Sequence, residues 1–443
     1  MFTQKQAVAG KPNKKKAPDK RIPSADKGPD DVSRSGTAGP EANALLSSQK
    51  SKRRIIIYLV ILGIVAGVLA TYLLVLSLIV SSKSENYAQD CEDAKLRGDW
   101  SQLELIAREW AGWEPDNQEP WLYAATAAQE VGNEEMLMEY LGQLPEDAPF
   151  DSFLLLSDLQ FQHDKIKAAE KSFLALVERE PESKEAHRRL NFFFAMTRQR
   201  NRLVSESRRA IRQGADIPES YLFLVGADWI TFTNGYNVNV GWAKKYPEDN
   251  EVFEVASALH LISSGVDQSM EEQDEKLKEQ LSKSGDLIRN LRIKYPQNRE
   301  MLILELMYHV HRANARKVGE LLNEMELDID DDSRFWRVIG WFHSYREDWE
   351  QAEEAYRKCL ELNPFDWQCR FEYSSVLRQL RKPEELKVMQ ESAAAGKEIM
   401  RRVLQADNTV DVPRSTLDLI IQYSRMCGEK EIAEKLSDRI YGR

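Results

Sequence analysis

Histidine and cysteine are scarce in this chain, which has six histidines and four cysteines among 443 residues. The cysteines are Cys91, Cys359, Cys369 and Cys427; none forms a C-x-x-C pair, and no paired histidine accompanies them. This spacing argues against a zinc or haem-attachment site. An oxidising compartment would permit a Cys359–Cys369 bridge. We favour two buried, unbridged thiols, because cysteine often serves as a small core residue.

The motifs of common reactions are also missing. The sequence has no glycine-rich phosphate loop, no H-E-x-x-H, no G-x-S-x-G and no calcium-loop pattern. His309 and His311, in YHVHRAN, stand two residues apart and therefore on different faces of a helix, which makes them poor co-ligands. We expect no catalytic residue, no cofactor, no metal site and no enzyme activity. An enzyme whose site is assembled from distant residues stays open as an alternative.

Charge is absent from residues 55–81, which contain the run IIIYLVILGIVAGVLATYLLVLSLIV, Ile55 to Val80. These 26 residues exceed the roughly 20 that cross a bilayer core. A cleaved signal peptide has a shorter apolar region that follows a short basic segment, whereas 54 residues precede this run. The sequence therefore predicts a retained transmembrane helix over 55–81.

The two flanks of this run differ in charge. Residues 1–54 carry 13 Lys/Arg against 5 Asp/Glu and end in KSKRR, whereas residues 82–443 carry 48 against 67. Basic residues collect on the cytoplasmic side of a membrane, so we expect a cytoplasmic tail and an extracytoplasmic body, periplasmic in a bacterium. The tail is rich in Pro, Gly, Ser and charge, which predicts disorder. Its lysines lack neighbouring aromatics that would stack on bases, which favours anionic lipid over nucleic acid.

Proline recurs at a regular interval in the acidic body. The prolines that follow helix-like stretches are Pro115, Pro149, Pro181, Pro247, Pro296 and Pro364. Their steps are 34, 32, 66, 49 and 68 residues, of which two are close to double the first step, and the step of 49 contains an acidic insert near 263–280. Self-similarity at such a period indicates a repeat array.

The repeated unit resembles the tetratricopeptide repeat, whose pattern is W-x2-L-G-x2-Y, then A-x3-F, then P. In residues 333–366 the signature places hold Trp336, Ile339, Gly340, His343, Ala352, Tyr356 and Pro364. Residues 150–183 match with Phe153, Leu156, Ser157, Ala169, Phe173 and Pro181, and residues 118–149 match with Trp121, Ala125, Leu137, Leu141 and Pro149. The other units are inferred from phase. The unit at 216–249 is the poorest match, so its second helix should be short or irregular.

The resemblance implies an all-α, right-handed solenoid of helix pairs, preceded by the transmembrane helix and the disordered tail. One helix pair cannot bury its apolar face alone, so stacking of pairs makes the core. We expect repeats over 82–400, interrupted by the insert near 263–280. A final helix pair over 401–443 should cap the solenoid.

In this family the first helices of successive units line a concave groove that takes up peptides or partner helices. By phase, the groove residues here are Arg334, Arg337, Trp341, Phe371 and Arg378. Arginine forks pair with carboxylates, and Trp and Arg are frequent binding hot spots. The alternative is that Arg334 and Arg337 pair with local acids such as Asp331 and Asp332. Trp341 stands where the family's carboxylate clamp has asparagine, which argues against a receptor for chaperone tails.

We therefore predict a single-pass membrane protein that docks other proteins, as a scaffold or assembly factor. Gly63 and Gly67 form a G-x-x-x-G in the span, a ridge typical of close helix packing, so homodimerisation through the span is a further hypothesis. The alternative function is a chaperone-like accessory of protein export or envelope assembly that holds client segments.

Overall fold

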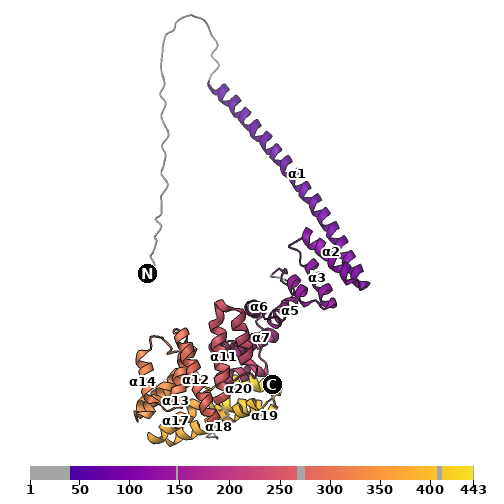
Figure 1. Ribbon diagram of the computed structural model, residues 1–443. Coiled ribbons are helices and arrows are strands. Elements are labelled where there is room, and N and C mark those ends of the chain that lie inside the picture. The colour runs from indigo at the N-terminus through magenta and orange to yellow at the C-terminus, as the bar shows by residue number, and fades with distance from the viewer. Residues whose placement is uncertain (1–39, 146–147, 267–274, 407–411, 443) are drawn as a thin grey trace, which may run out of the picture. The chain divides into compact units, whose positions relative to one another are not determined.

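The computed structural model describes residues 40–145, 148–266, 275–406 and 412–442. Every regular element in these ranges is a helix (Figure 1), which confirms the all-α prediction for the described residues. The first half contains α1 (Pro40–Leu96), α2 (Trp100–Trp113), α3 (Gln118–Val131), α4 (Glu134–Leu141), α5 (Phe150–Gln162), α6 (Ile166–Arg179), α7 (Lys184–Met196), α8 (Arg200–Gln213), α9 (Pro218–Gly226) and α10 (Gly235–Lys245). The second half contains the 3-10 turn η1 (Pro247–Asp249), α11 (Asn250–Val266), α12 (Glu275–Lys294), α13 (Arg299–His311), α14 (Ala315–Glu324), α15 (Ser333–Tyr345), α16 (Trp349–Leu362), α17 (Trp367–Gln379), α18 (Pro383–Leu404), α19 (Arg414–Met426) and α20 (Lys430–Tyr441).

The chain divides into two compact units, residues 1–83 and 84–443. In the first unit, α1 begins at Pro40, within the predicted tail of residues 1–54. The stretch PEANALLSSQKSKRR explains the early start, because it has proline at the first helical position and then good helix formers. The rest of the predicted tail, residues 1–39, lies outside the described residues.

In the apolar run of α1, the side chains whose exposure the structure describes, those of residues 59–77 and Val80, all face outward. Among the described residues, α1 is the helix long and apolar enough to cross a membrane by length and composition, with a mean hydropathy of 2.7 in its most apolar window and none of that window buried. The helix then continues to Leu96. Its last turns belong to the second unit, where Cys91 and Ala94 are fully buried in a core that includes Trp110.

A left-handed residue marks the turn between the two helices of most units. These residues are Gly98, Gly132, Asp164 and Arg198, at intervals of 34, 32 and 34, and then Ala313, Glu347 and Arg381, at intervals of 34 and 34. A residue with positive φ ends a helix by turning the chain back sharply. The backbone therefore repeats at the period that the prolines predict, independently of side-chain identity.

The unit at 333–366 shows why its signature residues are needed. A Cβ atom at Gly340 would lie 2.7 Å from the ring of Tyr356, so α15 and α16 approach closely at this glycine. Ala352 and Tyr356 are fully buried in one cluster with Cys359 and Cys369. The spacing of these residues reflects packing between the helices. The thiols of Cys359 and Cys369 are free, as we favoured, and burial raises the pKa of Cys359.

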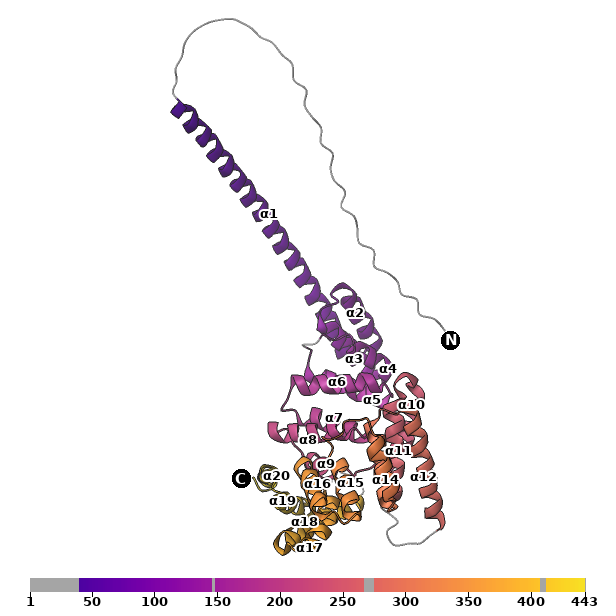
Figure 2. The same ribbon diagram turned by 90° about the vertical axis from the view of Figure 1, so that its left-hand side faces the viewer.

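The final helix pair does more than cap the end of the array. Arg208 on α8 makes two contacts of 3.0 and 2.9 Å with the carboxylate of Glu429, in the turn between α19 and α20. Arg439 on α20 makes contacts of 2.5 and 2.9 Å with Asp216, which precedes α9. Helix α9 also contacts α19, and Figure 2 shows α19 and α20 beside it. The C-terminal pair thus joins residues more than 200 positions earlier in the sequence.

Candidate protein-binding face

Charged pairs join the first helices of several neighbouring units. Arg189 on α7 meets Asp158 on α5 at 2.6 and 2.7 Å. Arg188, also on α7, lies 3.3 Å from Glu219 on α9. We call these pairs between first helices the ladder. They tie neighbouring units together along the face on which the groove is predicted.

Arg334, a predicted groove residue, forms one of the charged pairs of this ladder. Its guanidinium makes two contacts of 2.8 Å with Glu300 on α13 and contacts of 3.0 and 2.7 Å with Asp332. Asp332 also caps the N-terminus of α15 by accepting from the backbone N–H of Arg334 at 2.9 Å. Burial alone would raise the pKa of Asp332, but the adjacent Arg334 guanidinium outweighs it and holds that pKa well below its usual range.

Arg337, one turn later on α15, is held in the same way. Its Nη1 lies 2.9 and 3.0 Å from the two carboxylate oxygens of Asp366 and 2.8 Å from Oε1 of Gln368. Asp366 caps α17 by accepting from the N–H of Cys369 at 2.9 Å. Both members of the Arg337–Asp366 pair are buried. Arg334 and Arg337 are therefore paired with acids of the protein, as in the alternative given above. Of the two acids named there, Asp332 is a partner of Arg334, whereas Asp331 pairs with Arg299.

A second set of polar contacts lies across units that are distant in sequence. Asp228, after α9, pairs with Arg200 on α8 and accepts from Asn363 at 2.9 Å. Arg200 also donates to Ser333 at 2.9 Å. These contacts join units 184–215 and 333–366, and sequence reasoning missed them. No local pattern signals a partner about 130 residues away.

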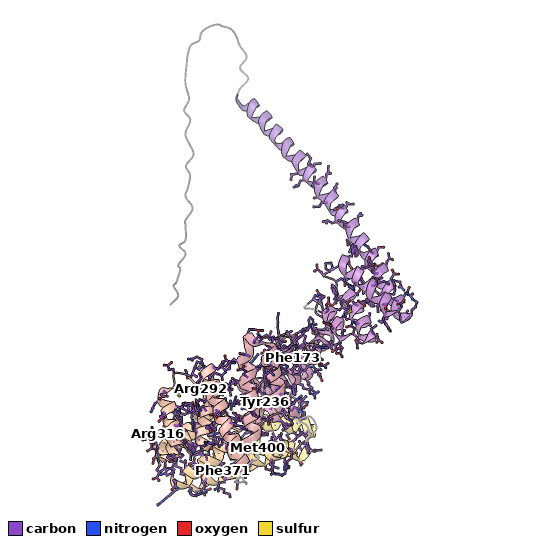
Figure 3. The ribbon with its side chains drawn as sticks, viewed as in Figure 1. Phe173, Tyr236, Arg292, Arg316, Phe371 and Met400 are labelled. Atoms are coloured by element: carbon purple, nitrogen blue, oxygen red, sulfur yellow. The ribbon has the colours of Figure 1, made fainter. Side chains whose placement is uncertain are left out.

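The other three predicted groove residues remain open to solvent. Phe371, labelled in Figure 3, is 63% exposed, Trp341 is half-buried and Arg378 is exposed. Tyr345, not predicted, is 58% exposed and its ring centroid lies 5.5 Å from that of Trp341. The structure thus separates the predicted set into two buried arginines and an exposed aromatic group with Arg378.

A partly buried acid, Glu372, follows Phe371 on α17. The hydroxyl of Tyr356 is 3.2 Å from Oε2 of Glu372 on α17. Burial raises the pKa of Glu372 to about 7, against the lowering effect of Arg337. Within the described ranges, no group of three or more His, Cys, Asp or Glu side chains could hold a metal ion. The face therefore offers aromatic and cationic contact surface to a ligand.

The small residues of the span also have open surroundings. A Cβ atom at Gly63 or Gly67 would meet no atom within 4 Å. Homodimerisation through this ridge stays a prediction.

No protein-family model matches the chain, and no curated protein matches it in sequence. Among solved structures it is similar to yeast Tom70, at 12% identity and a TM-score of 0.29, over 81% of this chain and 88% of that one. It is also similar to the Cut9–Hcn1 hetero-tetramer of the APC/C, at 10% identity and a TM-score of 0.30, over 82% and 73%. A tetratricopeptide repeat protein from Parabacteroides merdae gives 11% identity and a TM-score of 0.25, over 66% and 98%.

Proposed function

We propose that the chain is a tetratricopeptide-type scaffold that docks other proteins at a membrane. The family part of this proposal is supported by the turn residues at intervals of 32 or 34 and by the close approach of Gly340 and Tyr356. Stacked helix pairs of this kind present a long face to which partners bind. The chain would then act by positioning other proteins rather than by catalysing a reaction.

The exposed aromatic group on consecutive first helices carries the binding part of the proposal. Phe371 and Tyr345 are more than half exposed on a face where the ladder arginines are saturated by carboxylates. Exposed aromatic side chains that cluster on one surface are typical of interaction sites. A partner peptide or helix would cover them.

A capture experiment tests this face directly. The full chain, solubilised in detergent, is compared with the double variant Trp341→Ala, Phe371→Ala, and with Ile293→Ala as a matched control, since Ile293 is 75% exposed on α12. We expect the double variant to lose the partners that the wild type and the control retain. Equal capture by all three forms would refute the assignment of the face.

The anchor part of the proposal rests on the exposed apolar run of α1 and on the KSKRR segment before it. The N-terminus would be cytoplasmic, and the helical body would lie across the membrane. A reporter fused after Arg443 tests this topology. Activity of an extracytoplasmic reporter supports it, whereas activity of a cytoplasmic reporter at that position contradicts it.

A further inference from the structure

Arg378 differs from three other arginines on the first helices of their units. Arg189, Arg334 and Arg337 each contact a carboxylate. Arg378 is exposed near the end of α17, and no described residue lies within ion-pair or hydrogen-bond distance of its guanidinium. An arginine fork without a carboxylate is available to an external anion.

The aromatic side chains lie on the same face as Arg378. The contact of 2.8 Å between Arg337 and Gln368 places these two residues at the same level of α15 and α17. Trp341 is about one turn beyond Arg337, and Phe371 is about one turn beyond Gln368. The two aromatics are therefore at similar levels, and Arg378 follows on α17 about 10 Å farther along the axis, at a rise of about 1.5 Å per residue.

The charge of this face is positive, in contrast to the acidic body. Glu372 is turned towards the hydroxyl of Tyr356, and Asp348 is engaged by Arg346 at 3.3 Å. Glu347 is exposed in the turn after α15, beyond the level of the aromatics. Residues 82–443 carry 48 Lys/Arg against 67 Asp/Glu and are acidic as a whole. The unpaired arginine beside the exposed aromatics therefore makes this face positive on a negatively charged body.

We infer that Trp341, Tyr345, Phe371 and Arg378, here called the docking face, bind a short acidic segment of a partner protein. A bulky apolar side chain of the segment packs on Trp341 and Phe371, and a carboxylate farther along the segment pairs with Arg378. This inference rests on the proposed function and adds the chemistry of the partner. The burial of an apolar group beside a charge-assisted pair gives both affinity and a fixed direction of binding.

Two labelled peptides test the inference by fluorescence anisotropy with the full chain in detergent micelles. The acidic peptide contains a phenylalanine followed, two turns later, by aspartates, and the basic peptide has lysines in place of those aspartates. We expect the wild type to prefer the acidic peptide and Arg378→Glu to weaken its binding at least about tenfold, as loss of a charge-assisted contact implies. Arg378→Glu should also bind the basic peptide more tightly than the wild type does.

Arg425→Glu is the matched control. Arg425 lies three residues before the left-handed Gly428, as Arg378 lies three residues before the left-handed Arg381, and it is likewise exposed, but on α19. We expect this control to bind both peptides as the wild type does. Equal binding of the two peptides to the wild type, or no effect of Arg378→Glu, would overturn the inference.

A photo-reactive phenylalanine analogue in place of Phe371 separates this inference from the proposed function. Cross-linking of the full chain in its native membrane, followed by mass spectrometry, identifies the segment that covers the face. Cross-linked segments rich in Asp and Glu support the inference. Cross-linked segments without acidic residues refute the inference but leave protein docking standing, and the absence of any protein cross-link refutes both.

Discussion

The units at 333–366 and 216–249 have the same length but bury their first helices differently. In the first of these units, α15 packs on α16 through Gly340 and leaves Trp341 and Tyr345 on an open side. In the second, every residue of α9 from Glu219 to Gly226 is buried. Helix α9 contacts α7 and α8 on the chain before it and α19 from the far end of the chain.

This difference explains why the repeat signature is strong in one unit and lost in the other. The signature places apolar residues on the side of a helix that faces its neighbours and leaves the other side polar. A helix enclosed all round must be apolar all round, and YLFLV in α9 meets that need. The weak match at 216–249 therefore reflects the return of the C-terminal pair rather than decay of the fold.

The largest expected effect comes from the buried charge in unit 333–366. Arg337→Ala leaves the buried Asp366 without its cation and should lower the free energy of unfolding by about 3–5 kcal/mol. Arg439→Ala on α20, which removes the cation from Asp216 in unit 216–249, should cost less, because Asp216 keeps the hydroxyl of Tyr221 at 2.8 Å. Urea unfolding of the full chain in detergent measures both free energies.

Arg378→Ala, at an exposed site, is the control and should stay within about 0.5 kcal/mol of the wild type in free energy of unfolding. Equal losses for Arg337→Ala and Arg378→Ala would contradict the burial argument.

Two ionisable groups that lie next to these units, His260 on α11 and Glu372 on α17, should give pH dependences of opposite sign. Burial lowers the pKa of His260, which follows α10 on α11, to about 4 from 6.5. Between these values the unfolded chain takes up a proton that the folded chain excludes, so stability near α10 and α11 falls as pH falls. Glu372 has a pKa raised from 4.5 to about 7, so the folded state holds the extra proton and stability near α17 falls as pH rises through that window. Each effect is at most about 3.5 kcal/mol, at about 1.4 kcal/mol per pKa unit.

Hydrogen exchange, corrected for the intrinsic pH dependence of the rate, measures both effects in one sample. From pH 7 to pH 5 we expect protection to fall in α10 and α11 and to rise in α15 to α17. Glu372→Gln should abolish the rise and leave the fall unchanged. A change of the same sign in both regions would show that one of the two groups is not buried as described.

A smaller effect is expected at the glycines of the two units. Gly340→Ala places a Cβ atom 2.7 Å from the buried ring of Tyr356, and such overpacking costs about 1–3 kcal/mol. Gly226→Ala places a Cβ atom 2.5 Å from the buried Ile230 side chain and should cost a similar amount. Gly241→Ala, in α10, meets no atom within 4 Å and should stabilise the helix by about 0.5–1 kcal/mol. Thermal unfolding would contradict this order if Gly340→Ala were the most stable variant.

The sequence predicted what depends on contacts within a unit. The interval of the turns and the close approach at Gly340 follow from residues that are near in the chain. The sequence did not decide which residues pair with Arg334 and Arg337, because their partners Glu300 and Asp366 lie 34 and 29 residues away. The pairing of Arg208 with Glu429 spans 221 residues, and no periodicity carries that information. The buried run in α9 was the one available signal, since such a helix needs a cover on every side.

The return of the C-terminal pair to α8 and α9 is the central claim, and a charge-swap cycle on Arg208 and Glu429 tests it most directly. Urea unfolding of the full chain would compare Arg208→Glu, Glu429→Arg and the double swap with the wild type. Each single variant places like charges together, so each should lose stability, and the double swap should recover most of that loss, with a coupling of about 1 kcal/mol or more. Strictly additive losses in the double swap would show that these two residues do not meet and would contradict the closed arrangement.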